Sequence, residues 1–123
     1  MEVKIKSKAA AFIIEAAKSA FPREFIGLLK PDSHGNVKEI HVFPGSQFNH
    51  FSSSVDFLQV PIASGYLGSI HSHPSKNNNP SKQDIFFFSR YGSVHLIICY
   101  PFTLETIAAY NSQGNRIPFQ VCE

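Results

Sequence analysis

The chain has 123 residues, of which 43% are hydrophobic and 16% are charged. This composition predicts one globular domain spanning residues 1–123 and excludes an intrinsically disordered chain. A formal net charge of +2, with no cluster of Lys and Arg, argues against nucleic acid as a partner. Because the sequence has neither a long apolar run nor a signal-peptide pattern, we expect a cytoplasmic protein that does not enter a membrane.

The first predicted element is an amphipathic helix over Ser7–Ala20, because apolar residues recur there with the spacing of one helical face. Ser7 is expected to be the N-cap, and Pro22 is expected to stop the helix. The residues predicted to face the core are Ala9, Phe12, Ile13, Ala16, Ala17 and Ala20.

A β-hairpin is predicted after this helix. Glu24–Leu29 has the composition of a strand, and the turn-rich segment 31–36 separates it from a partner strand over Val37–Phe43. Pro44 then begins an irregular stretch, in which Val55–Pro61 is predicted to be another strand or a short helix.

The second half of the chain alternates between strands and a helix. A short strand over Leu67–Ile70 is followed by the polar loop Lys76–Pro80 and a helix over Ser81–Arg90. Val94–Tyr100 is apolar throughout, which predicts a central strand. On the second helix, the residues expected to face the sheet are Ile85, Phe87, Phe88 and Ser89.

The last predicted element is a hairpin formed by Thr106–Tyr110 and Ile117–Val121 around the turn 111–115. Together these elements predict an α/β or α+β sheet with at least two helices. Cys99 and Cys122 are too few for a disulfide scaffold. Cys99 is expected to be a buried apolar residue, and a Cys99–Cys122 bridge is possible only if their strands are neighbours.

The most informative motif is His71-Ser72-His73-Pro74 followed by Ser81-x-x-Asp84. Two histidines one residue apart lie on the same face of a strand, with Cα atoms roughly 6.5–7 Å apart, so their imidazoles can converge on one cation. Asp84 can supply a third ligand and water a fourth, which is the open coordination of a catalytic zinc ion. Taken alone, Ser81-x-x-Asp84 indicates a capping box, and the two histidines could be polar residues at an exposed strand end. Their combination favours the metal site.

A zinc hydrolase also needs a carboxylate that moves protons to and from water. Glu24 is the best candidate because it lies in an otherwise apolar segment at the mouth of the first strand; the alternative is a solvated charge at a strand end. The remaining histidines are interpreted as surface residues or hydrogen-bonded core residues; they are His34, His41, His50 and His95.

These residues resemble the complete signature of the JAMM (MPN-plus) metalloprotease family, and in particular its minimal stand-alone members from archaea and bacteria. The resemblance implies that His71, His73 and Asp84 bind one Zn²⁺. It implies that Glu24 is the general acid/base and that Ser81 helps to bind the oxyanion. It also implies a deaminase-like α/β/α sandwich with a curved mixed β-sheet flanked by helices.

The same resemblance implies a substrate and partner. The family cleaves the peptide or isopeptide bond after the C-terminal Gly-Gly of a ubiquitin-like modifier, and the short segments around the site here favour a small modifier or sulfur-carrier protein. Such a tail would lie extended beside a sheet edge. Val55–Pro61 and Asn77–Asn79 are the expected walls of its channel.

The sequence leaves two other functions to consider. A zinc-dependent base deaminase would need Pro-Cys-x-x-Cys, and the sequence has no Cys-x-x-Cys. A non-catalytic MPN-type interaction scaffold would typically lack one or more metal positions, whereas this chain has all of them. The sequence therefore favours an isopeptidase and keeps the scaffold as the alternative.

Overall fold

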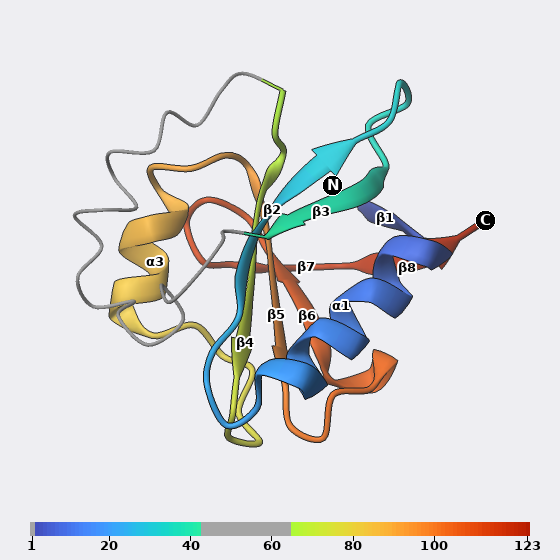
Figure 1. Cartoon of the computed structure of the whole chain (residues 1–123). Coiled ribbons are helices and arrows are strands. Elements are labelled where there is room, and N and C mark those ends of the chain that lie inside the picture. Colours follow the sequence, from blue (N-terminus) through green and yellow to red (C-terminus); the bar gives the residue numbers. More distant parts are fainter. Residues whose placement is uncertain (1, 43–64) are drawn as a thin grey trace.

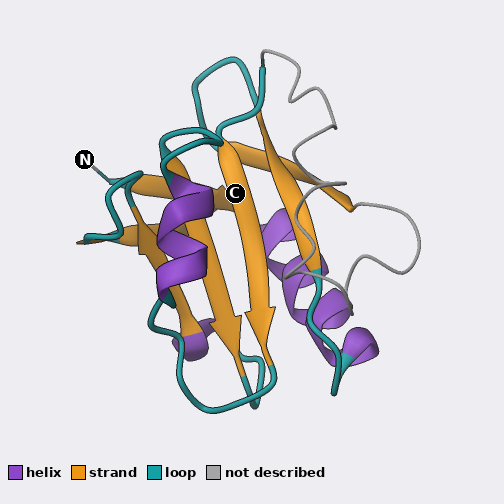
Figure 2. Cartoon of the chain, turned by 90° about the vertical axis from the view of Figure 1, so that its left-hand side faces the viewer, coloured by secondary structure: helices purple, strands orange, loops and turns teal. Residues whose placement is uncertain are grey.

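The computed structural model describes residues 2–42 and 65–123. An eight-stranded mixed sheet lies between two helices, with α1 on one face and α3 on the other (Figures 1 and 2). This arrangement confirms the expected α/β/α sandwich with a curved sheet. The elements are β1 Val3–Lys6, α1 Ser7–Ala20, β2 Ile26–Pro31, β3 Val37–Val42, β4 Gly68–His73, α3 Lys82–Phe88, β5 Val94–Cys99, the 3₁₀ helix η2 Leu104–Thr106, β6 Ile107–Tyr110, β7 Arg116–Ile117 and β8 Phe119–Cys122.

The strand order β7-β6-β5-β4-β2-β3-β1-β8 places two consecutive strands at opposite edges of the sheet. Only Pro118 separates β7 from β8 in the chain. The sheet must therefore curl until its two edges approach each other, and α1 lies inside the curl (Figure 1). Pairing is parallel between β4 and β5 and between β1 and β8, whereas β2 is antiparallel to both β3 and β4.

The predicted C-terminal hairpin is only partly correct. Ile117–Val121 is not one strand: only Arg116–Ile117 pairs with β6, and Phe119–Cys122 crosses to pair with β1. Proline has no N–H for a ladder, so a strand breaks naturally at Pro118. The carbonyl of Pro118 instead accepts from Val3 N at 3.0 Å. Strand β1 itself was not predicted.

Helix α1 has the predicted bounds, Ser7–Ala20, but its start and its buried face differ in detail. Its N-cap is Lys6, which makes no side-chain cap bond, because β1 leads directly into the helix. The prediction of Ser7 as N-cap is therefore wrong. Phe12 is 45% exposed and is also not a core residue. The buried face consists of small residues and one Ile, which lets the helix approach the sheet closely: Ala9, Ala10, Ile13, Ala17 and Ala20.

The sheet has a separate apolar cluster on each face. Along β5, which is buried throughout as predicted, Leu96 and Ile98 pack in the cluster that contains α1, and Ile97 packs in the cluster of α3. Phe87 and Phe88 are the large side chains that α3 contributes to its cluster.

Helix α3 is shorter than the predicted Ser81–Arg90, since Ser81 is its N-cap and it ends at Phe88. Its buried residues are Asp84, Phe87 and Phe88. Ile85 is only half-buried, and Ser89, which was predicted to face the sheet, is exposed.

Several strand boundaries differ from the predictions. Glu24 precedes β2 rather than beginning it, and β4 extends through both histidines to His73. The predicted strand from Thr106 starts one residue later, after η2. Phe43 and Val55–Pro61 lie outside the described residues.

Cys99 and Cys122 are both free, so the bridge that the sequence left open does not form. Among the described residues, no helix combines the length and apolar character needed to span a bilayer.

Gly68 begins β4 where the backbone of β5 leaves no room for a side chain, and replacing it should be costly. A Cβ added at Gly68 would lie 1.7 Å from the carbonyl oxygen of Val94, its partner in the β4–β5 ladder. Backbone atoms in a ladder cannot yield without breaking hydrogen bonds, so we expect Gly68→Ala to lower the free energy of unfolding by more than roughly 3 kcal/mol in urea titrations.

Gly35→Ala is the matched control, because Gly35 has a φ of +82° but no atom within 4 Å of an added Cβ. Only backbone strain of about 1–2 kcal/mol is expected there. Equal losses for the two variants would contradict the close approach at Gly68.

Candidate metal centre

Three polar side chains project from β4 toward α3. Ser69, His71 and His73 alternate with Ile70 and Ser72 along the strand, so all three lie on the same face. Ser69 and His71 are buried, and the side chain of His73 is 15% exposed. The polar residues thus run from the core toward the surface, and His73 is the most accessible of them.

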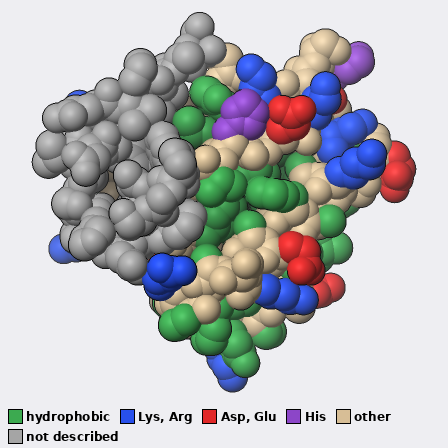
Figure 3. Space-filling model, viewed as in Figure 1, with side chains coloured by type: hydrophobic (Ala, Val, Ile, Leu, Met, Phe, Trp, Pro, Cys, Tyr) green, Lys and Arg blue, Asp and Glu red, His purple; other side chains and the backbone are tan. Residues whose placement is uncertain are grey.

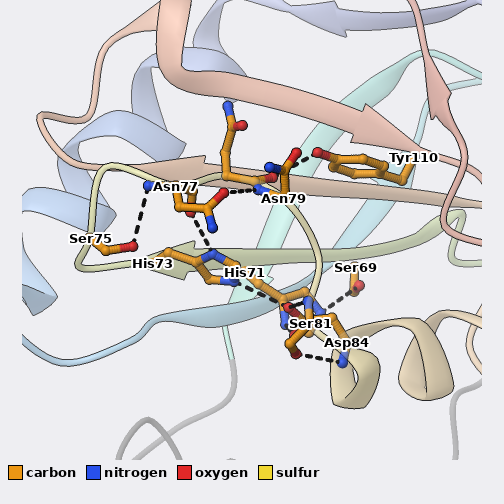
Figure 4. A network of polar contacts seen from close by, with 10 residues as sticks. Ser69, His71, His73, Ser75, Asn77, Asn79, Ser81, Asp84 and Tyr110 are labelled. Carbon is orange, nitrogen blue, oxygen red and sulfur yellow. Dashed lines mark hydrogen bonds and ion pairs between the residues drawn. The ribbon is translucent and has the colours of Figure 1, made fainter.

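Asp84 reaches the two histidines from the first turn of α3. Its Oδ1 lies 3.8 Å from His71 Nδ1, and its Oδ2 lies 3.2 Å from His73 Nε2. Asp84 is also one half of a capping box: Ser81 N donates to its Oδ2 at 2.9 Å, and Asp84 N donates to Ser81 Oγ at 3.0 Å. The cap fixes this carboxylate between the two imidazoles, so the sequence motif brings together His71, His73 and Asp84 as expected (Figure 4).

The spacing of these atoms suits one small cation. Two ligands bound at about 2.0–2.1 Å to a tetrahedral zinc ion lie roughly 3.3–3.4 Å apart. The distances from Asp84 to the two histidines bracket that value. Within residues 2–42 and 65–123 no three His, Cys, Asp or Glu side chains form a complete metal cage as they stand. The donor types fit zinc, and the two distances from Asp84 to the histidines are close to the spacing of ligands on one ion.

The loop after β4 fixes the orientation of His73. Its Nδ1 donates to the carbonyl of Asn77 at 2.9 Å, which leaves Nε2 directed at Asp84. The loop is itself held: Asn78 Nδ2 donates to the carbonyl of Thr106, and the Asn78 carbonyl accepts from Tyr110. The segment Asn77–Asn79 thus supports a candidate ligand, a role that the sequence did not predict.

The electrostatics of the cluster favour neutral His71 and ionised Asp84. Burial lowers the pKa of His71 to about 3, against the attraction of Asp84. Burial alone would raise the pKa of Asp84, but the hydrogen bond with His73, the nearby His71 and the Ser81 amide together lower it. Burial disfavours charge on His73 as well, yet its bonds to Asp84 and Asn77 raise its pKa. A neutral imidazole beside a carboxylate is the donor pair that zinc requires.

Glu24 lies at the edge of the same cavity. A cavity of about 350 Å³ is lined by Glu24, His73, Pro74, Ser75, Ser81, Gln83 and Asp84. The backbone next to Glu24 is tied to β4, since Phe25 N donates to Ser72 Oγ at 2.7 Å and Ser72 N donates to the Phe25 carbonyl at 2.9 Å. Burial raises the pKa of Glu24; the attraction of His73 partly offsets this, and Asp84 reinforces it. A carboxyl group with a raised pKa is suited to exchange protons.

Ser81 has the structural role that its motif alone indicated. Its Oγ accepts from the Asp84 amide as the N-cap of α3. Ser81 is nevertheless exposed and lines the cavity with Glu24. A hydroxyl that accepts in the cap retains its O–H as a donor, so the cap is compatible with a second role toward a substrate.

A second, larger cavity of about 620 Å³ lies between the start of α1 and β3, and none of the five predicted site residues lines it. Figure 3 shows hydrophobic side chains gathered near the middle of one face and charged side chains toward its right-hand side. His73, Asp84, Glu24 and Ser81 line the smaller cavity instead.

The other histidines agree with their predicted interpretation where they are described. His34 and His41 are exposed, and His95 is fully buried with hydrogen bonds to Ser69 Oγ and the Gly92 carbonyl. His50 lies outside the described residues. Ser69 and His95 were not predicted to belong to the site. The signal for Ser69 was its position two residues before His71, on the same strand face.

Burial of His95 should make the protein sensitive to acid. Burial lowers the pKa of His95 to about 4 from an ordinary value of 6.5. The unfolded chain then binds the extra proton first, so stability is lost as pH falls from about 6.5 to about 4, by at most roughly 3 kcal/mol. Urea unfolding across this range should show a shallower pH slope for His95→Gln than for the parent.

The exposed His34→Gln variant is the control for this measurement and should keep the slope of the parent. If His95→Gln and the parent lose stability equally between pH 6.5 and 4, His95 does not contribute to the acid sensitivity.

Comparisons with known proteins agree with this geometry. Residues 6–112 match the family described as prokaryotic homologs of the JAB domain. A curated protein of Haloferax volcanii, named a probable metalloprotease, is 31% identical over 121 residues, covering 91% of this chain and 74% of that protein.

Solved structures show the same fold. A JAB1/MPN domain protein from Archaeoglobus fulgidus is 35% identical with a TM-score of 0.79, covering 98% of this chain and 100% of that one. A structure described as JAMM, a metalloprotease-like zinc site in the proteasome and signalosome, is 32% identical with a TM-score of 0.79 and covers 100% of both chains. A Desulfitobacterium hafniense protein, 20% identical with a TM-score of 0.60, shares the fold alone.

Proposed function

We propose that this chain, which belongs to the family of prokaryotic homologs of the JAB domain, is a zinc-dependent peptidase that cleaves after the Gly-Gly tail of a small ubiquitin-like protein. The observation that carries the proposal is the placement of Asp84 between His71 and His73, at a cavity that Glu24 also lines. Three nitrogen and oxygen donors with room for solvent are the composition of a catalytic zinc site.

The proposed roles follow from the contacts. His71, His73 and Asp84 would hold Zn²⁺, one ion per chain. When bound, zinc supplies a Lewis acid that polarises the scissile carbonyl and lowers the pKa of water. Glu24 takes a proton from the attacking water and passes it to the leaving amine, a transfer that its raised pKa favours. The O–H of Ser81 donates to the oxyanion while its oxygen stays engaged in the cap.

The size of the cavity supports a glycine-rich substrate. Its volume of about 350 Å³ is at the low end of small-molecule pockets, which suits an extended segment with small side chains beside His73 and Asp84. A flexible Gly-Gly tail meets this requirement, and its exposed peptide groups could pair with a neighbouring backbone. The partners of the proposed enzyme are therefore small ubiquitin-like modifiers or sulfur-carrier proteins and their conjugates.

Metal analysis combined with fusion substrates tests the proposal. We expect about one zinc per chain and cleavage of a modifier–Gly-Gly–reporter fusion that stops with a chelator and returns with added zinc. A matched fusion ending in Ala-Ala should be cleaved far more slowly. Zinc binding without cleavage of any peptide fusion would contradict peptidase activity. Tight binding of a modifier without zinc would favour a non-catalytic scaffold instead.

A further inference from the structure

A buried line of hydrogen bonds runs from His71 away from the cavity and into the core. His71 Nε2 lies 2.9 Å from Ser69 Oγ, Ser69 Oγ lies 2.7 Å from His95 Nδ1, and His95 Nε2 lies 3.1 Å from the carbonyl oxygen of Gly92. Ser69, His71 and His95 are each at most 1% exposed. Bulk water therefore cannot take the place of any of these three side chains.

The far end of the line fixes where its protons lie. The Gly92 carbonyl can only accept, so His95 Nε2 carries a proton and donates. Burial keeps His95 neutral near pH 7, so its Nδ1 has a lone pair and accepts from the hydroxyl of Ser69. Because the Ser69 hydroxyl donates its only proton to His95, Ser69 Oγ accepts a hydrogen bond from His71 Nε2–H. A neutral His71 protonated at Nε2 then has its lone pair on Nδ1, the atom that lies 3.8 Å from Asp84 Oδ1.

We propose that Ser69 and His95 are positioning residues that hold His71 in the Nε2–H tautomer, so that Nδ1 is presented as the ligand atom toward Asp84. The inference rests on the proposed function only in naming zinc as the ion that Nδ1 would bind. Outer-shell partners of this kind set the tautomer and orientation of metal-binding histidines in proteins generally. In this chain the outer-shell partner is a serine hydroxyl, which is itself hydrogen-bonded to a second histidine.

Neighbouring strands and aromatic rings hold Ser69, His71 and His95 in position. Ser69 and His95 are paired residues of the parallel strands β4 and β5, so their side chains leave the sheet side by side on one face. The His95 and Phe88 rings are stacked, with centroids 4.3 Å apart and planes 11° apart, and the His71 and Phe87 rings pack edge to face with centroids 5.0 Å apart. Phe87 and Phe88 belong to α3, the helix that also carries Asp84. One helix therefore positions both the carboxylate and the hydrogen-bonded line.

The tautomer of His71 can be measured directly in metal-free protein. Two-dimensional proton–nitrogen-15 spectra of the histidine rings distinguish a protonated ring nitrogen from one with a lone pair, and a His71→Gln variant assigns the signals. We expect the parent to show Nε2 of His71 protonated and Nδ1 unprotonated at pH 7. A parent protonated at Nδ1 would overturn the proposal, whatever the activity of the enzyme.

Variants in the line give the second test. Ser69→Ala removes the acceptor of His71 Nε2–H, and His95→Phe keeps the stacked ring but lets the Ser69 hydroxyl turn and donate to His71. Both should move His71 toward the Nδ1–H form, whereas Ser69→Thr, which keeps the hydroxyl, should restore the tautomer of the parent. Ser72→Ala is the matched control, since it removes a buried hydroxyl of the same strand that bonds to Phe25 instead.

Zinc affinity shows whether the tautomer of His71 affects metal binding. Chelator competition should show zinc bound roughly 10–100-fold more weakly by Ser69→Ala than by the parent, with recovery in Ser69→Thr. If Ser69→Ala and His95→Phe both retain the Nε2–H tautomer, the positioning role is wrong even where zinc binding and cleavage are normal. If the tautomers behave as expected but the parent neither binds zinc nor cleaves a fusion, the proposed function fails and the role of Ser69 and His95 in fixing the tautomer stands.

Discussion

Glu24→Gln should cleave a Gly-Gly fusion roughly 10²–10⁴-fold more slowly than the parent while binding zinc equally well. The amide has nearly the same shape as the carboxylate but cannot take a proton from water. Glu24 is not one of the proposed zinc ligands. Its substitution therefore leaves the contacts of His71 and His73 with Asp84 in place. Single-turnover cleavage measured beside metal content separates the two effects.

The pH profile gives the same prediction a second readout. Because burial raises the pKa of Glu24, the active carboxylate is lost as pH falls through that raised value, and the acid limb of the rate should begin above the ordinary range of a glutamate. Glu15→Gln, on the exposed side of α1, is the control and should leave the rate and profile unchanged. A Glu24→Gln enzyme that cleaves as fast as the parent would disprove the assigned role.

The candidate site could be predicted from the sequence because its geometry is local. The His-x-His spacing within β4 and the Ser-x-x-Asp cap of α3 each follow from the period of one element. Only one packing step, α3 against the face of β4, is then needed to bring Asp84 to His71 and His73. Glu24 could be predicted from its apolar neighbours in the sequence, and in the structure its burial raises its pKa.

The line behind His71 could not be predicted in the same way. Ser69 and His95 lie 26 residues apart and meet only because β4 and β5 pair in parallel with one particular register. A sequence without known strand pairing does not give that register. The sequence alone therefore predicts His95 to be either a surface residue or a hydrogen-bonded core residue; the second alternative is correct but incomplete.

The errors in the fold have related physical causes. The pairing of β1 with β8 joins the two ends of the chain, and no local pattern encodes such a contact. The exposure of Phe12 and the cap at Lys6 both depend on how β1 leads into α1. Helical periodicity identified the correct segment, but the sheet determines which part of its apolar surface is buried.

Asp84→Asn should abolish both zinc binding and cleavage, and so differ from Glu24→Gln. The amide is close to isosteric and can still accept the Ser81 amide proton, so the cap of α3 can persist. It removes the negative charge that faces His71 and His73, however, and amides are far weaker zinc ligands than carboxylates. We expect zinc affinity to fall by more than roughly 100-fold, beyond the usual effect of an outer-shell partner.

Asp32→Asn is the matched control, because Asp32 also accepts backbone amides, those of His34 and Asn36, but in an exposed turn. Its zinc affinity and cleavage rate should equal those of the parent, and circular dichroism should show both variants folded.

The Asp84→Asn variant should also change how the stability of the protein depends on pH. Since its neighbours hold the pKa of this carboxyl low, its contribution is present near neutral pH and is lost as pH falls through that lowered value. An Asp84→Asn protein that keeps one zinc per chain and cleaves normally would show that the carboxylate only caps α3, and the ligand set would have to be sought elsewhere.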